Sequence, residues 1–156
     1  MSMAWNIFLR NDIVYIPTVA NVESAFCLDI EPVEVAPAAD IEAVQRALIR
    51  AMNRGNPKIP MPSGPPFPEP VVLKHAKVKS WLEFEEDCLN WTIDEEDGIY
   101  SLRRGLKVAN RGWEYSSNET EVLPPGIGIE DIARRVAYLV HENVSRPNVK
   151  NAPFAG

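Results

Sequence analysis

The sequence predicts a single α+β domain, in which an antiparallel sheet packs with about three helices. Three observations predict this class: stretches with apolar residues at helical spacing, several short alternating segments, and a length of 156 residues. A chain of this length buries roughly 70% of the surface that its unfolded form exposes. With 46% hydrophobic and 24% charged residues, the composition is typical of a globular protein. We expect one domain over residues 1–156.

The N-terminal part of the chain predicts three strands. Trp5 to Leu9 and Ile13 to Ile16 are short apolar segments separated by three polar residues, which indicates a hairpin. Pro17 is expected to end the second strand, because proline cannot donate a hydrogen bond to a sheet. From Phe26 to Val35 apolar residues recur at alternate positions, with an irregularity at Pro32, which predicts the third strand.

A helix is predicted between Asp40 and Gly55. Asp40 can cap its first turn, and Gly55 can close its last turn. Its apolar residues recur at helical spacing: Ile41, Val44, Leu48 and Met52. We therefore expect an amphipathic helix here.

Residues 56–70 form a proline-rich connector that holds seven of the chain's 14 prolines. Such a segment favours polyproline II and excludes a helix or a central strand. Its plainer interpretation is a rigid loop that crosses the surface. Three proline-x-x-proline spacings would also suit an aromatic groove of a partner: Pro57 with Pro60, Pro62 with Pro65, and Pro65 with Pro68.

After the connector the chain again alternates between strand and helix signals. Val71 to Val78 predicts a strand, and Ser80-Trp81-Leu82-Glu83 predicts a helix that begins with a capping box. Asn90 to Ile93 and Ile99 to Leu102 predict a hairpin that turns at Asp97 and Gly98.

The C-terminal part predicts one more strand and one more helix. The strand signal is Trp113 to Tyr115. The helix signal is a set of apolar residues at helical spacing: Ile129, Ile132, Val136, Leu139 and Val140. Gly126-Ile127-Gly128 lacks the third glycine and the preceding strand of a phosphate-binding loop, so it predicts a plain turn. The tail after Arg146 is expected to fray.

The best functional signal is the acidic window from Glu83 to Asp97. It holds eight of the chain's 22 acidic residues and no lysine or arginine. The other 14 acids are balanced by 16 basic residues, so the net charge of −6 arises from this window. A surface of one sign implies a partner of the opposite sign. Trp81 and Trp91, which accompany the window, are expected in the core rather than at an interface.

The window predicts a partner-binding site of eight residues. Helical spacing places four of them together on a solvent-facing side, away from Trp81, Phe84 and Cys88. The tip of the predicted hairpin adds the other four. The predicted site is Glu83, Glu86, Asp87, Asn90, Asp94, Glu95, Glu96 and Asp97. Two competing interpretations stay open: a solvated charged face without a role, and internal pairing with Arg103, Arg104, Lys107 and Arg111.

Signals for catalysis and metal binding are weak. His75 and His141 have no motif around them, and a nucleophilic pair with Cys27 or Cys88 needs a geometry that sequence does not show. The acidic window lacks the ligand order of a calcium loop. We therefore expect a protein that is not an enzyme and has no cofactor and no metal.

The expected location is the cytoplasm. The N-terminus lacks a basic region followed by an apolar stretch, and the apolar runs are too short to span a membrane. The two cysteines fit neither a zinc spacing nor a redox pair, which indicates reduced thiols, although a disulfide between them stays open. Net negative charge disfavours direct binding to nucleic acid. An acidic surface suits instead the basic groove of an enzyme that acts on nucleic acid.

Three segments resemble small bacterial immunity proteins that accompany contact-dependent growth inhibition toxins. They are Val78-Lys79-Ser80-Trp81-Leu82-Glu83-Phe84-Glu85-Glu86, Asn90-Trp91-Thr92-Ile93, and Gly112-Trp113-Glu114-Tyr115 with Val122-Leu123-Pro124. The short, acidic, α+β profile adds to this resemblance. It implies a cytoplasmic protein that binds the C-terminal domain of a secreted toxin, often a nuclease, and blocks it.

The sequence thus predicts a binding protein that neutralises a basic toxin domain through an acidic surface, with no direct nucleic-acid partner and no membrane partner. One alternative is a small hydrolase, assisted by carboxylates or a metal, that uses Glu83, Glu86 and Asp87. A second alternative is a housekeeping adaptor that binds through the connector from Pro57 to Pro70. The oligomeric state is open.

Overall fold

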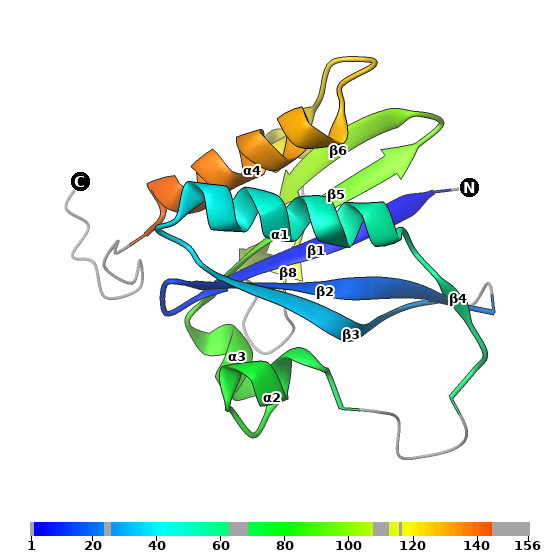
Figure 1. Ribbon diagram of the computed structural model, residues 1–156. Coiled ribbons are helices and arrows are strands. Elements are labelled where there is room, and N and C mark those ends of the chain that lie inside the picture. Colours follow the sequence, from blue (N-terminus) through cyan, green and yellow to red (C-terminus); the bar gives the residue numbers. More distant parts are fainter. Residues whose placement is uncertain (1, 24–25, 63–68, 108–112, 116, 145–156) are drawn as a thin grey trace.

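Seven strands form one sheet in the computed structural model, which describes residues 2–23, 26–62, 69–107, 113–115 and 117–144. Their order is β3-β2-β1-β5-β6-β9, all neighbours being antiparallel, and β4 runs parallel to β2 (Figure 1). The strands are β1 (Met3–Arg10), β2 (Ile13–Val22), β3 (Phe26–Pro37), β4 (Lys58–Ile59), β5 (Cys88–Glu96), β6 (Ile99–Arg104) and β9 (Thr120–Val122). A separate short hairpin joins β7 (Leu106–Lys107) and β8 (Trp113–Glu114).

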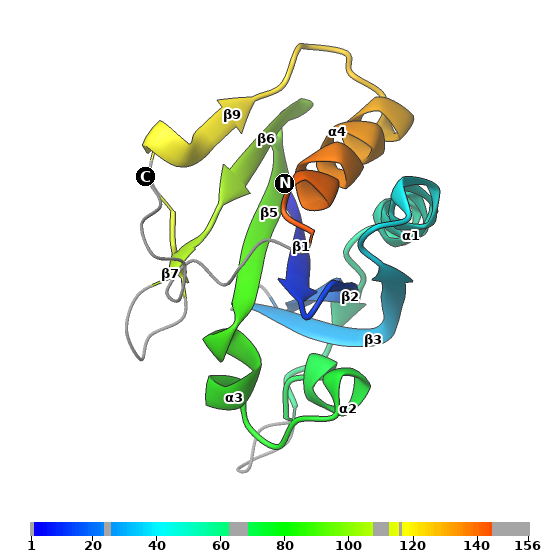
Figure 2. The same ribbon diagram turned by 90° about the vertical axis from the view of Figure 1, so that its left-hand side faces the viewer.

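The described helices lie on different sides of this sheet. The two long ones, α1 (Ile41–Arg54) and α4 (Ile129–Glu142), lie side by side on one face. In Figure 2 they stand to the right of β1, β5 and β6, while α2 (Val72–Ala76) and α3 (Trp81–Glu86) lie below the strands. A single turn of 3-10 helix (Ser117–Glu119) leads into β9. The predicted α+β class is therefore confirmed.

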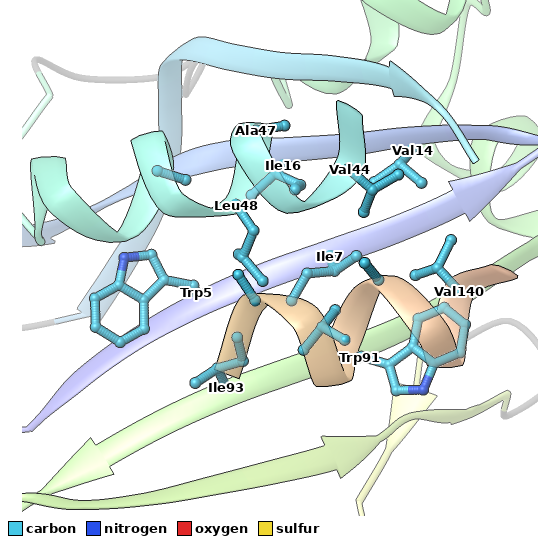
Figure 3. Close-up of a cluster of buried hydrophobic side chains, with 14 of the residues drawn as sticks. Trp5, Ile7, Val14, Ile16, Val44, Ala47, Leu48, Trp91, Ile93 and Val140 are labelled. Carbon is cyan, nitrogen blue, oxygen red and sulfur yellow. The ribbon is translucent and has the colours of Figure 1, made fainter. Parts of the chain in front are cut away.

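The larger core lies between the sheet and the two long helices. Trp5 and Ile7 of β1 meet Trp91 and Ile93 of β5 beneath Leu48 of α1 (Figure 3). All five are nearly inaccessible to solvent. Burial of such side chains stabilises the fold by roughly 1.5–3 kcal/mol each. The expectation that Trp91 belongs to the core is confirmed.

A smaller core lies on the opposite face of the sheet. Phe8 of β1 and Tyr15 of β2 contact Phe84 of α3, with ring centroids 5.5 and 5.8 Å away in edge-to-face geometry. Trp81 stacks on Phe84 at 5.3 Å, and Trp113 meets Trp81 at 5.7 Å. Edge-to-face pairs add roughly 0.5–1.5 kcal/mol beyond burial. Trp81 is therefore part of this core, as the sequence predicts.

Local sequence signals explain most of the element boundaries. The Asp40 carboxylate accepts a hydrogen bond of 3.0 Å from the Ala43 amide at the start of α1, and Gly55 ends the helix with φ of 69°. At the other end of the sheet, Asp97 and Gly98 have φ of 53° and 81°, which is the geometry of a tight hairpin turn. Both elements are as predicted.

The predicted strand over Val71 to Val78 is wrong, because the structure forms the short helix α2 there. Val72 and Leu73 are buried in the smaller core and Ala76 packs beside them, so the apolar residues follow a helical spacing. Lys77 takes a left-handed conformation with φ of 59° and ends the helix. Apolar runs this short do not distinguish strand from helix.

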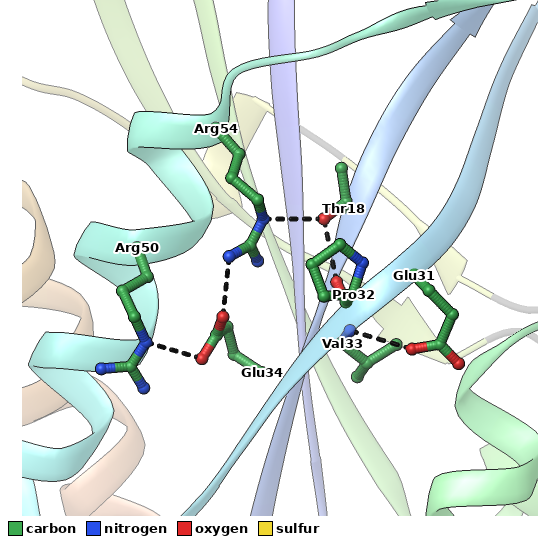
Figure 4. Close-up of polar contacts among 7 residues, drawn as sticks. All are labelled: Thr18, Glu31, Pro32, Val33, Glu34, Arg50 and Arg54. Carbon is green, nitrogen blue, oxygen red and sulfur yellow. Dashed lines mark hydrogen bonds and ion pairs between the residues drawn. The ribbon is translucent and has the colours of Figure 1, made fainter.

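The prediction that Pro17 ends the second strand is also wrong. Strand β2 continues to Val22, and the ladder with β3 shifts after Pro17, which leaves Glu31 and Pro32 as a bulge. Thr18 fastens this bulge, since its hydroxyl donates to the Pro32 carbonyl at 2.8 Å and accepts from Arg54 Nε at 3.0 Å (Figure 4). The bulge in β3 therefore lets β2 continue through Pro17 inside the sheet.

Ion pairs also connect the region of the bulge in β3 to the helices on both sides of it. Glu34 accepts from Arg50 Nε at 2.8 Å and from Arg54 at 2.7 Å, which ties β3 to the end of α1 (Figure 4). Burial would raise the pKa of Glu34, but hydrogen bonds from the two arginines hold it below its usual value. On the opposite face Glu31 contacts Lys74 and His75 of α2. His75 is thus in a helix and not in a strand.

Other predictions have mixed outcomes. Within the proline-rich connector, Lys58 and Ile59 do pair with β2, as a two-residue parallel strand. Residues 63–68 of the connector and the tail after Arg146 lie outside the described residues. The possible disulfide is absent, because Cys27 and Cys88 are both free. The final helix is α4, as predicted, and Gly128 is its N-cap residue.

Candidate functional site

The acidic window does not form one patch, because strand β5 separates its two halves. Glu83, Glu86 and Asp87 lie at α3, before the strand begins. The other four predicted acids, Asp94 to Asp97, lie at the far end of the strand and in the turn to β6 (Figure 1). At about 3.3 Å per residue, the seven positions from Asp87 to Asp94 place the nearest members of the two groups roughly 23 Å apart. A small partner surface therefore contacts one group or the other.

Asn90 is buried, so its predicted place beside the exposed acids is wrong. Helical spacing does not apply to it, because α3 ends at Glu86 and Asn90 belongs to β5. It is 2% exposed, its amide nitrogen donates to the Ile7 carbonyl at 3.3 Å, and its oxygen accepts from the Tyr115 hydroxyl. Its role is to satisfy polar groups inside the fold.

Part of the acidic window is paired internally, as one competing interpretation predicts. Arg103 Nε lies 3.0 Å from Asp94, and Lys107 Nζ lies 3.0 Å from Glu85, which is 2% exposed. Glu95 accepts a hydrogen bond from the Gly98 amide at 2.8 Å and so supports the turn. These contacts give several of the carboxylates structural roles.

The capping box at the start of α3 gives Glu83 a structural role as well. Ser80 accepts from the Glu83 amide at 3.1 Å, as predicted, and the Glu83 carboxylate accepts from the Lys79 amide at 3.3 Å. Glu86 and Asp87 are exposed at the end of the same helix, and Glu96 and Asp97 are exposed at the hairpin. Glu83 is exposed as well, so five members of the predicted site are exposed to solvent.

A second acidic surface lies on the side of the sheet opposite α1 and α4, beyond the part that α2 and α3 cover. Because Trp91 and Ile93 face the larger core, the alternate residues Thr92 and Asp94 face this side. We call it the open face. Its residues are Asn6, Cys27, Asp29, Thr92, Asp94, Glu96, Ile99, Ser101, Arg103, Tyr115 and Val122.

The strand register orders these residues into rows. Val122, Ser101 and Asp94 are successive partners across β9, β6 and β5, and the row ends at Ala4 of β1. The next row runs from Thr120 through Arg103 and Thr92 to Asn6. Neighbouring strands are about 4.8 Å apart, so each row brings together residues from four strands.

Hydrogen bonds connect the polar residues of the open face. Asn6 Nδ2 donates to Asp29 Oδ1 at 3.0 Å. The Thr92 hydroxyl lies 3.2 Å from Asn6 Oδ1 and 3.1 Å from the Tyr115 hydroxyl, and Tyr115 donates to Asn90. Since a threonine has a single hydroxyl hydrogen, Thr92 donates to one neighbour at a time. This chain of contacts fixes residues that lie far apart in sequence.

The open face is negatively charged. Burial raises the pKa of Asp29 to about 6, against the opposing effect of the Asn6 hydrogen bond. Burial also raises the pKa of Asp94, with Arg103 opposing it. The pKa of the Cys27 thiol is raised by burial and, to a smaller extent, by the negative charges of Asp29 and Asp94. Among the described residues, Asp29 has no ion-pair partner.

The chemistry that this surface offers is recognition of positive charge. Carboxylates accept hydrogen bonds from guanidinium and ammonium groups, and such charge-assisted bonds are stronger than neutral ones. In the described part of the chain, no three histidine, cysteine or acidic residues come together in a group that could hold a metal ion. Cys88 is buried, and burial raises the pKa of its thiol. None of the helices in the described ranges is long and apolar enough to cross a membrane.

The fold and the site together define an α+β domain with a negatively charged sheet face. No family model matches the chain, and no curated protein matches its sequence. A solved structure with a similar fold is a protein of unknown function, NMB0488, from Neisseria meningitidis. It is 12% identical to this chain, the match covers 88% of this chain and 93% of that one, and the TM-score is 0.61. At this identity the likeness shows the fold alone.

Sequence reasoning missed Asp29, Asn6 and Tyr115 as members of a surface. The alternation of Asn90, Thr92 and Asp94 along one strand is a signal for a polar sheet face. The identity of the neighbouring residues depends on strand order and register, which have no local signature.

Proposed function

We propose that this protein is an immunity-type inhibitor, which binds a basic toxin domain in the cytoplasm and blocks it. The observation that carries the proposal is the acidic surface formed by the open face and the β5–β6 turn. It presents Asp29, Asp94, Glu96 and Asp97, and Arg103 is the described cation paired within it. The resemblance of the sequence to small bacterial immunity proteins supplies the kind of partner.

The physical argument is electrostatic. A nuclease domain holds phosphates with lysine and arginine side chains, so a surface of carboxylates competes for the same cations. Charge of opposite sign also accelerates the encounter between the two proteins. The hydrolase alternative depends on Glu83, Glu86 and Asp87, which lie at α3, where the Glu83 carboxylate already accepts a hydrogen bond from the Lys79 amide. The adaptor alternative depends on the connector, whose residues 63–68 lie outside the described part of the chain.

The partner can be identified by capture and then tested for inhibition. The tagged protein is purified from its native cells at low and at high salt, and mass spectrometry identifies any partner of near-equal amount. We expect a basic domain that is retained at low salt and arrests growth when expressed alone, and growth should recover when the inhibitor is co-expressed. A captured domain whose toxicity is unaffected by the inhibitor would contradict the proposal.

Charge neutralisation tests the acidic surface itself. The variant Glu96→Gln with Asp97→Asn removes two charges from the β5–β6 turn. We expect its association with the captured domain to be several-fold slower and less sensitive to salt. The matched control, Glu130→Gln with Asp131→Asn, removes two charges from the first turn of α4. Equal association rates for the two variants would contradict a role for the acidic surface.

A further inference from the structure

The open face carries exposed apolar side chains beside its carboxylates. Val122 is 66% exposed, Tyr115 42% and Ile99 40%. Val122 lies in the same row as Asp94, with Ser101 between them, and Ile99 is paired with Glu96. Apolar patches rimmed by polar residues mark surfaces that bind another protein, and aromatic side chains such as that of Tyr115 are enriched in such surfaces.

We propose that the open face is the docking surface for an arginine side chain of the protein partner, with the guanidinium group seated between Asp29 and Asp94 against Tyr115. This inference rests on the proposed function, and it adds the position and the chemistry of the contact. A chain of hydrogen bonds runs from Asp29 through Asn6 and Thr92 to Tyr115. Asp94 lies two positions from Thr92 on the same side of β5 and pairs with Ala4, two positions from Asn6.

Charge complementarity selects a cation as the occupant. Asp29 is partly buried, and the only hydrogen bond described for its carboxylate comes from a neutral amide, that of Asn6. A carboxylate in such a place is stabilised by an opposite charge, and a bound cation supplies it. The face therefore favours a basic side chain over an acidic or neutral one.

Arginine suits the geometry better than lysine does. Its planar guanidinium group can bond two carboxylates at once and can stack on an aromatic ring, and it loses less hydration than an ammonium group. The Tyr115 hydroxyl is already bonded to Thr92 and Asn90 inside the fold. The exposed part of this side chain is therefore available for stacking.

Arg103 acts as an internal competitor for the same carboxylate. It lies 3.0 Å from Asp94, with the two side chains 45% and 32% exposed. Ion pairs this accessible contribute little to stability, so a guanidinium group of a partner can displace it. Removal of Arg103 should therefore strengthen binding, whereas removal of either carboxylate should weaken it.

The test uses a peptide of nine arginines as the probe and the full chain as the receptor. We expect Asp94→Asn and Asp29→Asn each to lower the affinity for the peptide at least threefold more than the control Asp131→Asn does. We expect Arg103→Met to raise the affinity at least threefold more than the control Arg134→Met does. The control pair, Asp131 with Arg134 at 2.8 Å, is an exposed ion pair on α4. In methyl NMR spectra the probe should shift Ile99 and Val122 more than Leu82 and Leu106. A gain in peptide affinity in Arg103→Met cannot arise from misfolding of the variant.

Two outcomes overturn the inference. One is an equal effect of the open-face variants and the α4 controls on the peptide affinity. The other is a captured toxin domain whose binding is insensitive to Asp29→Asn and Asp94→Asn but is lost with Glu96→Gln and Asp97→Asn. The proposed function would then stand without an arginine docked between Asp29 and Asp94. If the peptide maps to the open face but no toxin domain is captured, the docking surface stands and the proposed function fails.

Discussion

Asp29 has the most informative environment of any single residue on the open face. Asp29 is partly buried, and its described neighbours supply one neutral hydrogen bond to the carboxylate but no cation. The open face also holds Cys27, Asp94 and Tyr115, and its Arg103 pairs with Asp94 at 3.0 Å. A charge held at this position lowers the stability of the free protein at neutral pH. Such an arrangement is typical of a site that is completed by a ligand.

The pKa of Asp29 predicts a pH dependence of stability. In the folded protein the pKa is raised to about 6, whereas an unfolded aspartate has a pKa of about 3.9. Between these values the folded state keeps a proton that the unfolded state releases, so stability falls as pH rises from 4 to 6. Asp29→Asn removes this loss and should be about 1–3 kcal/mol more stable than the natural chain at pH 7.5. Urea unfolding at pH 4 and pH 7.5 measures the difference.

The control for this variant is Asp131→Asn. Asp131 is exposed at the first turn of α4, where loss of a negative charge lowers stability by less than about 1 kcal/mol. In Asp29→Asn the new amide oxygen can still accept the hydrogen bond from Asn6, so the local geometry is kept. If Asp29→Asn and the natural chain change stability in parallel between the two pH values, the assigned environment of Asp29 is wrong.

At the scale of elements, the loop after β6 lies close against β5, and the contact is made at Gly105. Gly105 lies over Asn90, and its amide donates to the Asn90 carbonyl at 2.9 Å. A Cβ atom at position 105 would lie 2.7 Å from Asn90 Oδ1 and 2.8 Å from Trp113 Cβ. The absence of a side chain at this position lets the β7–β8 hairpin approach β5. This approach positions Tyr115 on the open face.

Gly105→Ala is therefore expected to lower the free energy of unfolding by about 1–3 kcal/mol, because the new methyl group overpacks a buried contact. It should also weaken the peptide binding described above, since Tyr115 is displaced. Gly128→Ala is the control, because a Cβ atom there has no neighbour within 4 Å. Urea unfolding should show a loss of no more than about 1 kcal/mol for the control, which arises because alanine is a poorer N-cap for α4 than glycine. Similar losses for both variants would contradict the close approach.

Elements with a long or complete local signal were predictable from the sequence. The helix after Asp40 has a cap, a sustained apolar stripe and a closing glycine, and the structure matches it. The hairpin at Asp97 and Gly98 has strong turn chemistry and is also correct. The segment from Val71 to Val78 was not predictable, because its apolar residues fit both a strand and a short helix. Packing against Phe8 and Tyr15 decides in favour of the helix.

The candidate site was predictable only in part. The acidic window correctly indicates where exposed carboxylates occur, but helical spacing was applied beyond Glu86, where a strand begins. The open face joins Asn6 of β1, Asp29 of β3 and Thr92 of β5, which are up to 86 positions apart. Contacts over such separations follow from strand order and register, and short-range patterns do not specify either.

At the scale of the whole molecule, a single strand supports both cores. Ile7 and Leu9 of β1 face the larger core, and Phe8, which lies between them, faces the smaller core. Two tryptophans belong to each side: Trp5 and Trp91 to the larger core, Trp81 and Trp113 to the smaller. Loss of packing in one core therefore leaves β1 without support on that face, and the other core depends on the same strand.

This arrangement predicts that the protein unfolds as one cooperative unit. Phe84→Ala in the smaller core should lower the free energy of unfolding by about 3–5 kcal/mol, and Leu48→Ala in the larger core by about 2–5 kcal/mol. In both variants, urea transitions followed by tryptophan fluorescence and by far-ultraviolet circular dichroism should coincide. The dichroism reports mainly α1 and α4, whereas the fluorescence reports both cores. An early fluorescence step in Phe84→Ala without a change in dichroism would show instead that α2 and α3 unfold independently of the sheet and the long helices.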